Sequence, residues 1–428
     1  MAFNDSMKRQ CSKSMKQRAT QRVLGRENTR AYVLNVFALA AVVLGYSIQT
    51  PVAAAEDWRV VRGDVSGTGV APNKLPDQLT ELWTYKAADP AGFDATAVIA
   101  DGIIYVGDNE GTIHAVRLSD GKALWTKEFE ESSGFAAGAA IHQGRLFVAD
   151  MSGTARCLDL TDGRELWTAK LESEVHAGPT PVENSVLFTT EGGTLACLDS
   201  ASGDKKWEFK IDAPLRCTPT IKDGRAMLAG CDSLLHAINV SDGSEAFTVD
   251  IDGPTGATAA MLGDRVFFGT EGGIFYGVDV GTADGKTPSV AWTYRDPRRG
   301  QPIRSAAAVT EKLVVFGSQG RAVTAIDPKT GEEKWKLATR SRVDSSPVIA
   351  GDRVVAATSA GKLYLLDTAD GAAKWEADFG GGFLASPAVV DGRLIIGNTD
   401  GTLYCFGAKP ENGRNLTTEN TEGTEKKK

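Results

Sequence analysis

Short apolar runs separated by turns fill residues 81–408 of this 428-residue chain. One run in each unit ends at a turn that is often Asp-Gly, as at Asp101-Gly102, Asp223-Gly224 and Asp391-Gly392. A second apolar run and a glycine-containing turn follow, and a third run alternates apolar and polar residues, as at 363–366. Alternation with a period of two is typical of β-strands, and Asn, Asp and Gly accept the backbone angles of tight hairpin turns. The pattern therefore predicts an all-β chain.

An aromatic residue ends each unit of this pattern and marks an internal repeat. The anchors recur at intervals of 42, 42, 40, 40, 45, 43 and 40 residues, at Trp83, Trp125, Trp167, Trp207, Phe247, Trp292, Trp335 and Trp375. Each interval contains four short predicted strands. Four-stranded units with a period of about 40 residues are the blades of β-propellers, so we expect that architecture.

The two ends of the repeat region complement each other. Only three predicted strands follow Trp375, at about 386–390, 394–396 and 403–406. The segment 81–85 around Trp83 supplies the missing fourth strand. We therefore predict an eight-bladed β-propeller over residues 81–408, closed by pairing its N- and C-terminal strands, because closure removes exposed sheet edges. A seven-bladed ring with unpaired ends is the alternative. Residues 56–80 are expected to cross the rim or one face as a strap.

The N-terminal region has the pattern of an export signal. Residues 33–46 form an apolar run behind a basic stretch, and Ala53-Ala54-Ala55 gives a small-x-small cleavage pattern. We expect residues 1–55 to be a signal peptide with a long basic start, cleaved near Ala55, and the mature chain to be periplasmic or in the cell envelope. The alternatives are an uncleaved anchor, or translation starting at Met7 or Met15. The polar segment 409–428 is expected to be disordered.

Charge and composition narrow the class of partner. Residues 1–55 carry a net charge of +6, so the remaining residues carry −14 of the chain total of −8. Nucleic-acid binding requires a basic surface, so nucleic acid is not an expected partner. Apolar residues make up 42% and charged residues 24% of the chain, which excludes wholesale disorder. Six cysteines are too few to be its main source of stability.

The segment from the third to the fourth strand carries a specific motif. It reads CLDLTDGRELW at 157–167, CLDSASGDKKW at 197–207, AIDPKTGEEKW at 325–335 and LLDTADGAAKW at 365–375, with looser copies at 115–125 and 237–247. The Asp can cap the turn, the Gly takes the positive-φ corner, and the Trp packs between blades. This motif resembles the tryptophan-docking repeat of the PQQ-like eight-bladed propellers.

The resemblance implies one of two functional branches. One comprises quinoprotein dehydrogenases, which have a pair of adjacent cysteines over the quinone and a central Ca²⁺. The other comprises non-catalytic propellers similar to BamB, the outer-membrane assembly lipoprotein. This chain has no Cys-Cys dipeptide, and eight blades leave almost no insertions to build a cofactor chamber. We therefore expect no cofactor and no catalytic residues, and a monomeric protein-interaction scaffold. It lacks the lipidated cysteine of BamB. A PQQ- and Ca²⁺-dependent dehydrogenase is the alternative.

The start of the first strand in each blade faces the mouth of the central channel. Aligning the repeats places five chargeable residues there, Asp94, His176, Arg216, Arg304 and Asp344, together with Ala136, Gly256 and Leu384. The ring predicts either a site for a ligand or ion, or a solvated ring whose charges satisfy the loop backbone. The next residue in each blade is small, as expected if it points inward at a crowded axis.

Charge is distributed unevenly over the loops of this face. The loops that follow the anchors carry glutamates in the early blades, such as Glu128, Glu130 and Glu172. In the sixth and seventh blades they carry Arg295, Arg298, Arg299, Arg340 and Arg342. We call these five arginines the basic sector and hypothesise that they dock an acidic peptide or an anionic polymer. Ordinary solubilising charge is the alternative.

Cysteine and histidine positions complete the set of candidates. Cys217 and Cys231 lie near the two ends of one predicted hairpin. A plain two-residue turn places Cys217 opposite Gly230, whereas a β-bulge would allow a disulfide with Cys231, so both a disulfide and two free thiols remain open. Cys157, Cys197 and Cys405 share one repeat position and are expected to fill a small buried slot. The histidines His114, His142, His176 and His236 form no metal-binding spacing, and no metal site is expected.

Overall fold

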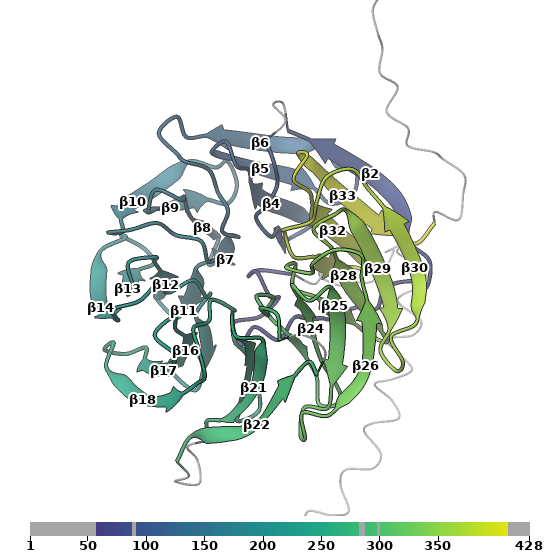
Figure 1. Ribbon diagram of the computed structural model, residues 1–428. Coiled ribbons are helices and arrows are strands. Elements are labelled where there is room, and N and C mark those ends of the chain that lie inside the picture. Colours follow the sequence, from purple (N-terminus) through teal and green to yellow (C-terminus); the bar gives the residue numbers. More distant parts are fainter. Residues whose placement is uncertain (1–56, 88–90, 282–286, 298–299, 410–428) are drawn as a thin grey trace, which may run out of the picture. The chain divides into compact units, whose positions relative to one another are not determined.

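The repeat units fold as separate sheets arranged in a ring (Figure 1). The computed structural model describes residues 57–87, 91–281, 287–297 and 300–409. The chain divides into two units, residues 1–54 and 55–428, and every described residue belongs to the second. The predicted signal peptide and the predicted disordered tail beyond Lys409 lie outside the described residues.

The described strands form eight sheets, which are the blades of a propeller. Seven sheets have four strands, and the sheet that contains β27–β30 has a fifth, short strand at its edge. From the channel outward, the strands are β3 (Val98–Ala100), β4 (Ile103–Gly107), β5 (Thr112–Arg117) and β6 (Ala123–Glu128) in blade 1; β7 (Ala140–His142), β8 (Arg145–Ala149), β9 (Thr154–Asp159) and β10 (Glu165–Lys170) in blade 2; β11 (Thr180–Val182), β12 (Ser185–Thr189), β13 (Thr194–Asp199) and β14 (Lys205–Lys210) in blade 3; β15 (Thr220–Lys222), β16 (Arg225–Ala229), β17 (Leu234–Asn239) and β18 (Glu245–Asp250) in blade 4. They continue as β19 (Ala260–Leu262), β20 (Arg265–Gly269), β21 (Ile274–Asp279) and β22 (Ser289–Arg295) in blade 5; β23 (Ala308–Val309), β24 (Val314–Ser318), β25 (Ala322–Ile326) and β26 (Glu333–Ala338) in blade 6; β27 (Val348–Ala350), β28 (Arg353–Ala357), β29 (Lys362–Asp367) and β30 (Ala373–Asp378) in blade 7; β31 (Ala388–Val390), β32 (Arg393–Gly397), β33 (Thr402–Gly407) and β2 (Thr80–Lys86) in blade 8.

Blade 8 joins the two ends of the repeat region. The N-terminal strand β2 pairs antiparallel with the C-terminal strand β33, and Trp83 lies opposite Cys405. This confirms the predicted eight blades and the predicted mode of closure. The closing strand is also attached to blade 1, because the Tyr85 hydroxyl lies 2.9 Å from His114 Nδ1, and His114 Nε2 lies 2.9 Å from Asp108 Oδ2.

A β-bulge beside each anchor turns the aromatic ring toward the neighbouring blade. In blade 2, for example, the register between β9 and β10 shifts between Glu165 and Trp167. The Trp167 indole then donates a hydrogen bond of 3.2 Å to the carbonyl of Ser200 in blade 3. The same ring lies against Gly203, where an added Cβ would approach Trp167 Cδ2 to 2.7 Å. The turn glycine is therefore required both for its φ of +79° and for contact with the indole.

The predicted turn chemistry is present as well. Asp223 and Gly224 have φ values of +49° and +72°, as two-residue hairpin turns of the primed type require. In the motif turns, the Asp159 carboxylate accepts a hydrogen bond from the Thr161 amide. The Asp367 carboxylate likewise accepts one from the Ala369 amide.

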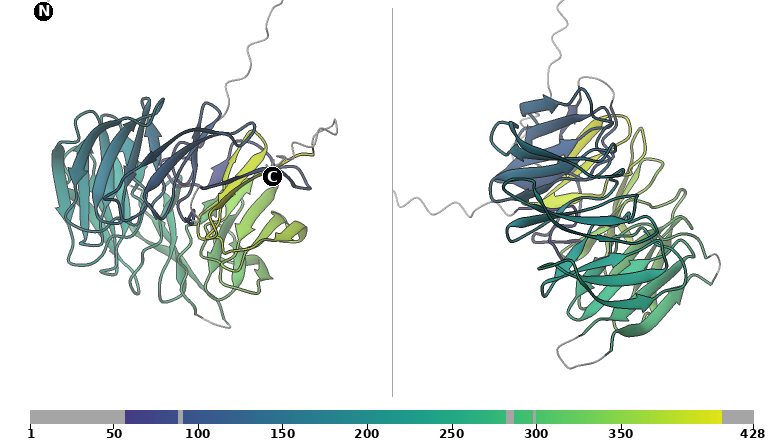
Figure 2. Two further views of the ribbon diagram at one scale, coloured as in Figure 1. Left: turned by 90° about the horizontal axis from the view of Figure 1, so that it is seen from above. Right: turned by 90° about the vertical axis from the view of Figure 1, so that its left-hand side faces the viewer.

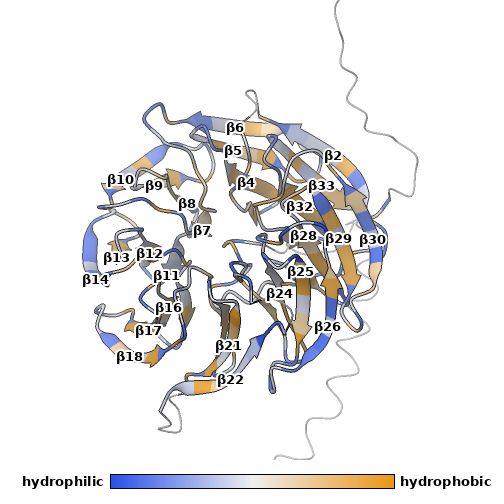
Figure 3. Cartoon of the chain, viewed as in Figure 1, coloured by the Kyte–Doolittle hydropathy of each residue, from blue (hydrophilic) through white to orange (hydrophobic). Residues whose placement is uncertain are grey.

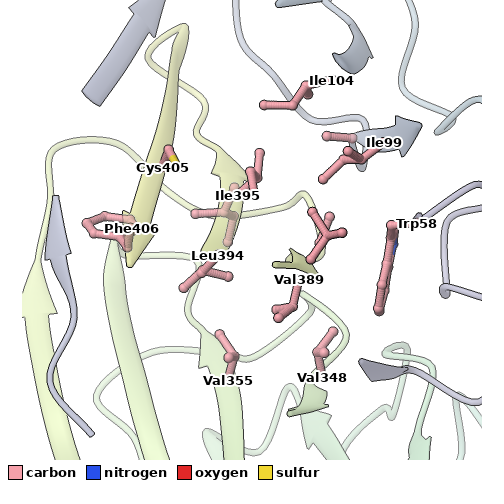
Figure 4. Close-up of a cluster of buried hydrophobic side chains, with 14 of the residues drawn as sticks. Trp58, Ile99, Ile104, Val348, Val355, Val389, Leu394, Ile395, Cys405 and Phe406 are labelled. Carbon is pink, nitrogen blue, oxygen red and sulfur yellow. The ribbon is translucent and has the colours of Figure 1, made fainter. Parts of the chain in front are cut away.

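The core lies between neighbouring blades rather than in one central cluster. Figure 3 shows hydrophobic residues along strands such as β29 and hydrophilic residues on outer strands such as β14 and β26. The largest buried cluster lies where the ring closes, and it combines Trp58 and Ile99 with Val389, Leu394 and Phe406 (Figure 4).

The predicted strap runs across the face of the ring opposite the channel mouth. Its two-residue strand β1 (Val70–Ala71) pairs parallel with β27. Carbonyl groups of the strap accept hydrogen bonds from one amide on the innermost strand of six blades, those of Ile99, Ile141, Ile221, Met261, Val309 and Ile349. The equivalent residue of blade 3 is Pro181, which has no N–H to donate. Figure 2 shows the ring from two further directions, with the strands of the blades running between its two faces.

We predict that Gly203→Ala destabilises the protein more than Gly224→Ala. Both glycines have positive φ, which costs an alanine about 1–3 kcal/mol. Only Gly203 also meets a neighbouring indole, since nothing lies within 4 Å of a Cβ added at Gly224. Overpacking adds about 1–3 kcal/mol. Urea unfolding of the two variants measures the difference. Equal unfolding midpoints would contradict the role assigned to the Trp–Gly contact.

Candidate functional site

The residues predicted at the channel mouth line one cavity on the ring axis. The cavity has a volume of about 210 Å³, and its mouth is lined by Asp94, Ala136, His176, Arg216, Gly256, Arg304, Asp344 and Leu384. The structure therefore brings together the residues that aligning the repeats placed at the mouth, although they are far apart in the sequence. Their use by a ligand stays a prediction.

Each chargeable side chain at the mouth contacts a polar partner. Arg216 Nε lies 2.7 Å from Glu191 Oε1, and Arg304 Nε lies 2.8 Å from Glu271 Oε1. Further pairs are His176 with Glu174 at 3.2 Å, Asp344 with Arg342 at 2.8 Å and Asp94 with the Asn109 amide at 2.9 Å. The hydrogen bond to Glu191 raises the pKa of Arg216, and the hydrogen bond to Glu271 raises the pKa of Arg304. The charges of the ring are therefore largely balanced within the face itself.

In blades 4, 6 and 7 the next residue does not point inward as we expected, whereas Ala177 of blade 3 lines the cavity. Cys217, Ser305 and Ser345 are almost completely buried. The Ser305 hydroxyl donates to the Gly317 carbonyl, and the Ser345 hydroxyl donates to the Ala385 carbonyl. Side chains alternate along a strand, so the residue after a channel-lining one packs between blades instead. Its small size reflects that packing.

The residue two positions after each mouth residue forms a second ring inside the cavity. Five of these residues carry hydroxyl groups, and they are Thr96, Thr218, Thr258, Ser346 and Ser386. Each hydroxyl oxygen accepts a hydrogen bond of 3.0–3.2 Å from the main-chain amide of the equivalent residue in the preceding blade. We call this set the hydroxyl ring. The repeat alignment contained its signal, Thr or Ser at a fixed offset, but the sequence analysis did not use it.

The strap forms the floor of the cavity. Val61 and Arg62 line it, and a Cβ added at Gly138 would approach Val61 Cγ1 to 2.2 Å. The guanidinium of Arg62 donates to the carbonyl groups of Ala307 at 3.1 Å and Pro347 at 2.8 Å. Burial lowers the pKa of Arg62 to about 10, against an opposing effect of Asp64. Sequence reasoning missed Arg62 because the strap has no counterpart in the repeats.

The predicted basic sector is described only in part, since Arg298 and Arg299 lie outside the described residues. Arg295 is exposed and donates to the Gly272 carbonyl at 3.3 Å. Arg340 is exposed, and within the described part of the chain neither it nor Arg295 forms an ion pair. Arg342 is exposed and pairs with Asp344. Two uncompensated cations therefore remain on this part of the mouth face.

The structure contains no disulfide between Cys217 and Cys231. Both are free thiols. The hairpin has plain register, with Thr220 opposite Met227, and no bulge shifts Cys231 toward Cys217. The Cys231 thiol donates to the Thr255 carbonyl at 3.4 Å. Burial raises the pKa of Cys217 to about 12, so this thiol is not activated for nucleophilic chemistry.

The remaining cysteines and histidines have structural contacts. Cys157, Cys197 and Cys405 are fully buried, as their shared repeat position predicted. His236 lies between Asp232 and Glu245, at 2.9 and 2.7 Å, and far along the sequence from the equivalent His114. Within the described residues, no group of three or more His, Cys, Asp or Glu could hold a metal ion. In the same residues, no helix is long and apolar enough to cross a membrane.

Comparison with known families gives an extended match. The family model described as outer membrane protein assembly factor BamB matches residues 76–149, 109–230, 211–346 and 323–416. Together these matches span all eight blades. No curated protein sequence matches the chain significantly.

Solved structures with the same fold include both functional branches. BamB from Moraxella catarrhalis has a TM-score of 0.66 at 18% identity and covers 77% of this chain and 100% of its own. Quinohemoprotein alcohol dehydrogenase from Comamonas testosteroni has a TM-score of 0.68 at 16% identity and covers 85% of this chain and 82% of its own. The computationally designed protein Ika8 has a TM-score of 0.66 at 16% identity and covers 77% of this chain and 99% of its own. At these identities the likeness establishes the fold alone.

We predict that Thr218→Val destabilises the protein by about 1–3 kcal/mol, because it leaves the buried Gly178 amide without its acceptor. Thr126→Val is the matched control, since Thr126 is exposed on β6 and valine suits a strand equally well. Urea unfolding compares the two. A neutral Thr218→Val variant would show that the hydroxyl ring does not hold the blades together.

Proposed function

The chain belongs to the family described as outer membrane protein assembly factor BamB, and from this membership we propose that it is an exported, non-catalytic interaction scaffold of the cell envelope. In this proposal the mouth face binds a protein partner, with a role similar to that of BamB in outer-membrane protein assembly. The observation that carries it is the contrast between paired charges at the channel mouth and the uncompensated Arg295 and Arg340 beside it.

The regularity of the blades supports a scaffold. Most turns are short, and the described mouth residues contain no nucleophile hydrogen-bonded to a base. Acyl or phosphoryl transfer requires such a constellation, or convergent carboxylates around a metal. Propellers present their loops as an extended surface, which suits binding to a macromolecule.

The residues at the axis do not fit pyrroloquinoline quinone with Ca²⁺. Calcium takes six to eight oxygen ligands, usually including several carboxylates. The two mouth carboxylates, Asp94 and Asp344, already accept hydrogen bonds from the Asn109 and Gln319 amides. Asp344 also pairs with Arg342. No adjacent cysteine pair exists in the sequence. We therefore derive no reaction step through this cofactor.

A quinoprotein dehydrogenase is kept as the alternative function. The specific observation in its favour is the fold likeness to quinohemoprotein alcohol dehydrogenase from Comamonas testosteroni, at a TM-score of 0.68. It would require a cofactor site built from residues other than those expected from the dehydrogenases.

The basic sector gives the proposed partner its chemistry. Exposed glutamates, such as Glu128, Glu130 and Glu172, lie where the chain leads into blades 2 and 3, and the exposed arginines lie where it leads into blades 6 and 7. An acidic segment of the partner, or an anionic polymer, would be oriented by this contrast. Contacts between exposed charges weaken as ionic strength rises, because the Debye length falls to about 3 Å at 1 M salt.

We predict that Arg340→Glu combined with Arg342→Glu abolishes most partner capture when crosslinking is performed in the exporting cell and the attached proteins are identified. The matched control is Arg117→Glu with Arg164→Glu, because these exposed arginines flank turns of the opposite face. Capture should fall in the first variant only, and should fall in the wild type as salt rises. Equal capture by both variants would end the assignment of the basic sector.

The dehydrogenase alternative has a direct test. Purified protein is incubated with pyrroloquinoline quinone and Ca²⁺, and then assayed for bound quinone absorbance and for alcohol-dependent dye reduction. We expect neither signal, because the described carboxylates do not form a calcium site. Stoichiometric quinone binding with dye reduction would replace the scaffold proposal by the alternative.

A further inference from the structure

A buried positive charge that forms no ion pair with any described residue lies at the floor of the axial cavity. The Arg62 side chain is almost inaccessible, with the residue 3% exposed. Among the described residues its guanidinium donates to carbonyl oxygens alone, those of Ala307, Ser346 and Pro347. Its Nε–H has no partner among the described residues. Buried charges in proteins are normally paired, because transfer out of water is costly for an unpaired ion.

The wall of the cavity adds further hydrogen-bond donors. Each oxygen of the hydroxyl ring already accepts a main-chain amide of the preceding blade. A hydroxyl that accepts in this way still has its own proton to donate. Five such groups, at Thr96, Thr218, Thr258, Ser346 and Ser386, surround the space above Arg62. The lining therefore favours a ligand that accepts several hydrogen bonds.

The mouth and the volume limit what can bind. The cavity of about 210 Å³ lies below the range of about 300–1,000 Å³ that is usual for drug-sized ligands. Arg216 and Arg304 lie at the cavity mouth on either side of Gly256, where they are paired with Glu191 and Glu271. The cation available to an entering anion is therefore Arg62 at the floor rather than the arginines of the mouth.

We propose that the axial cavity binds a small oxyanion, a phosphate or a small carboxylate, whose negative charge lies against Arg62 and whose oxygens accept from the hydroxyl ring. The site is separate from the partner surface proposed above and does not depend on it. The ligand supplies the ion-pair partner that the buried guanidinium lacks among the described residues, where the charge of Asp64 only partly offsets the effect of burial on the pKa of Arg62.

Asp94 opposes this binding and makes the site testable in two directions. Its Oδ1 atom is buried and has no hydrogen-bond partner among the described residues, whereas its Oδ2 accepts from Asn109. Asp94 lines the same cavity, so its negative charge repels an entering anion. Removing that charge should strengthen binding, and removing the charge of Arg62 should weaken it.

The experiment is isothermal titration calorimetry of the purified full chain with inorganic phosphate and, separately, with succinate. We expect saturable binding at one site per chain for at least one of them. Arg62→Met should weaken this binding about tenfold or more, because a charged hydrogen bond to the anion is lost. Asp94→Asn should strengthen it about threefold or more, in line with the loss of a nearby like charge.

The matched controls are Arg164→Met and Asp212→Asn, which remove an exposed charge of the same sign away from the cavity. Neither should change affinity by more than about twofold at 0.15 M salt, where exposed charges are screened. Circular dichroism and thermal melting verify that each variant is folded. If Arg62→Met fails to fold because the strap detaches, the Asp94→Asn result alone decides.

Each possible result of the titrations either supports or overturns the proposed oxyanion site. Binding of phosphate alone or of succinate alone, with both variants moving as stated, supports the proposal and identifies the oxyanion class. No binding of either probe by the wild type overturns it. Binding that Asp94→Asn leaves unchanged overturns it as well, since the anion then lies elsewhere. Partner capture by the mouth face is unaffected by any of these results.

Discussion

The ring depends on one contact that is repeated from blade to blade, the packing of an anchor indole on the turn glycine of its neighbour. Gly121 meets Trp83, Gly163 meets Trp125 and Gly371 meets Trp335 in the same way as Gly203 meets Trp167. Five of the anchor tryptophans also donate to a carbonyl group beside that turn. At six of the eight junctions between blades, one blade thus contributes an indole and the next a turn glycine, whereas Trp375 packs near Phe406 instead. Such an arrangement is stable only when no blade lacks a neighbour, so the chain must close.

Closure explains why segments outside the regular repeats are held so firmly. Strand β2 completes blade 8 and is tied to blade 1 by the Tyr85–His114–Asp108 hydrogen bonds. The strap then caps the innermost strands, whose free edges would otherwise leave amides unpaired. At blade 3 the strap contacts Gly178 through Val61 but forms no such hydrogen bond, because Pro181 has no amide to donate. Because the strap lies across the axis, it converts a channel into a cavity with a floor.

The sequence predicted most of what the repeat encodes, although not the hydroxyl ring, and missed what lies outside the repeat. The period, the anchors and the mouth residues, such as Arg216 and Arg304, followed from aligning equivalent positions. The direction of the next residue, including Cys217, was wrong because alternation within the strand sends it between blades. The Cys217–Cys231 disulfide depended on a bulge that the hairpin lacks. Arg62 could not be predicted, since the path of a strap is set by tertiary packing rather than by local pattern.

The contrast between repeated and irregular segments also indicates where charged side chains without an ion-pair partner lie. Loops of adjacent blades lie side by side, so charges placed by the repeat can find partners there, as Arg216 of blade 4 pairs with Glu191 in a turn of blade 3. Two of the cations that form no ion pair among the described residues occur where the repeat is interrupted, whereas Arg340 lies in a regular loop. Arg295 follows the longer connection in blade 5, and Arg62 enters from outside the repeats altogether. The repeat pairs many of its own charges, and irregular segments add charge with which the ring can recognise something else. Binding sites on scaffolds of this kind should therefore be sought first at departures from the repeat.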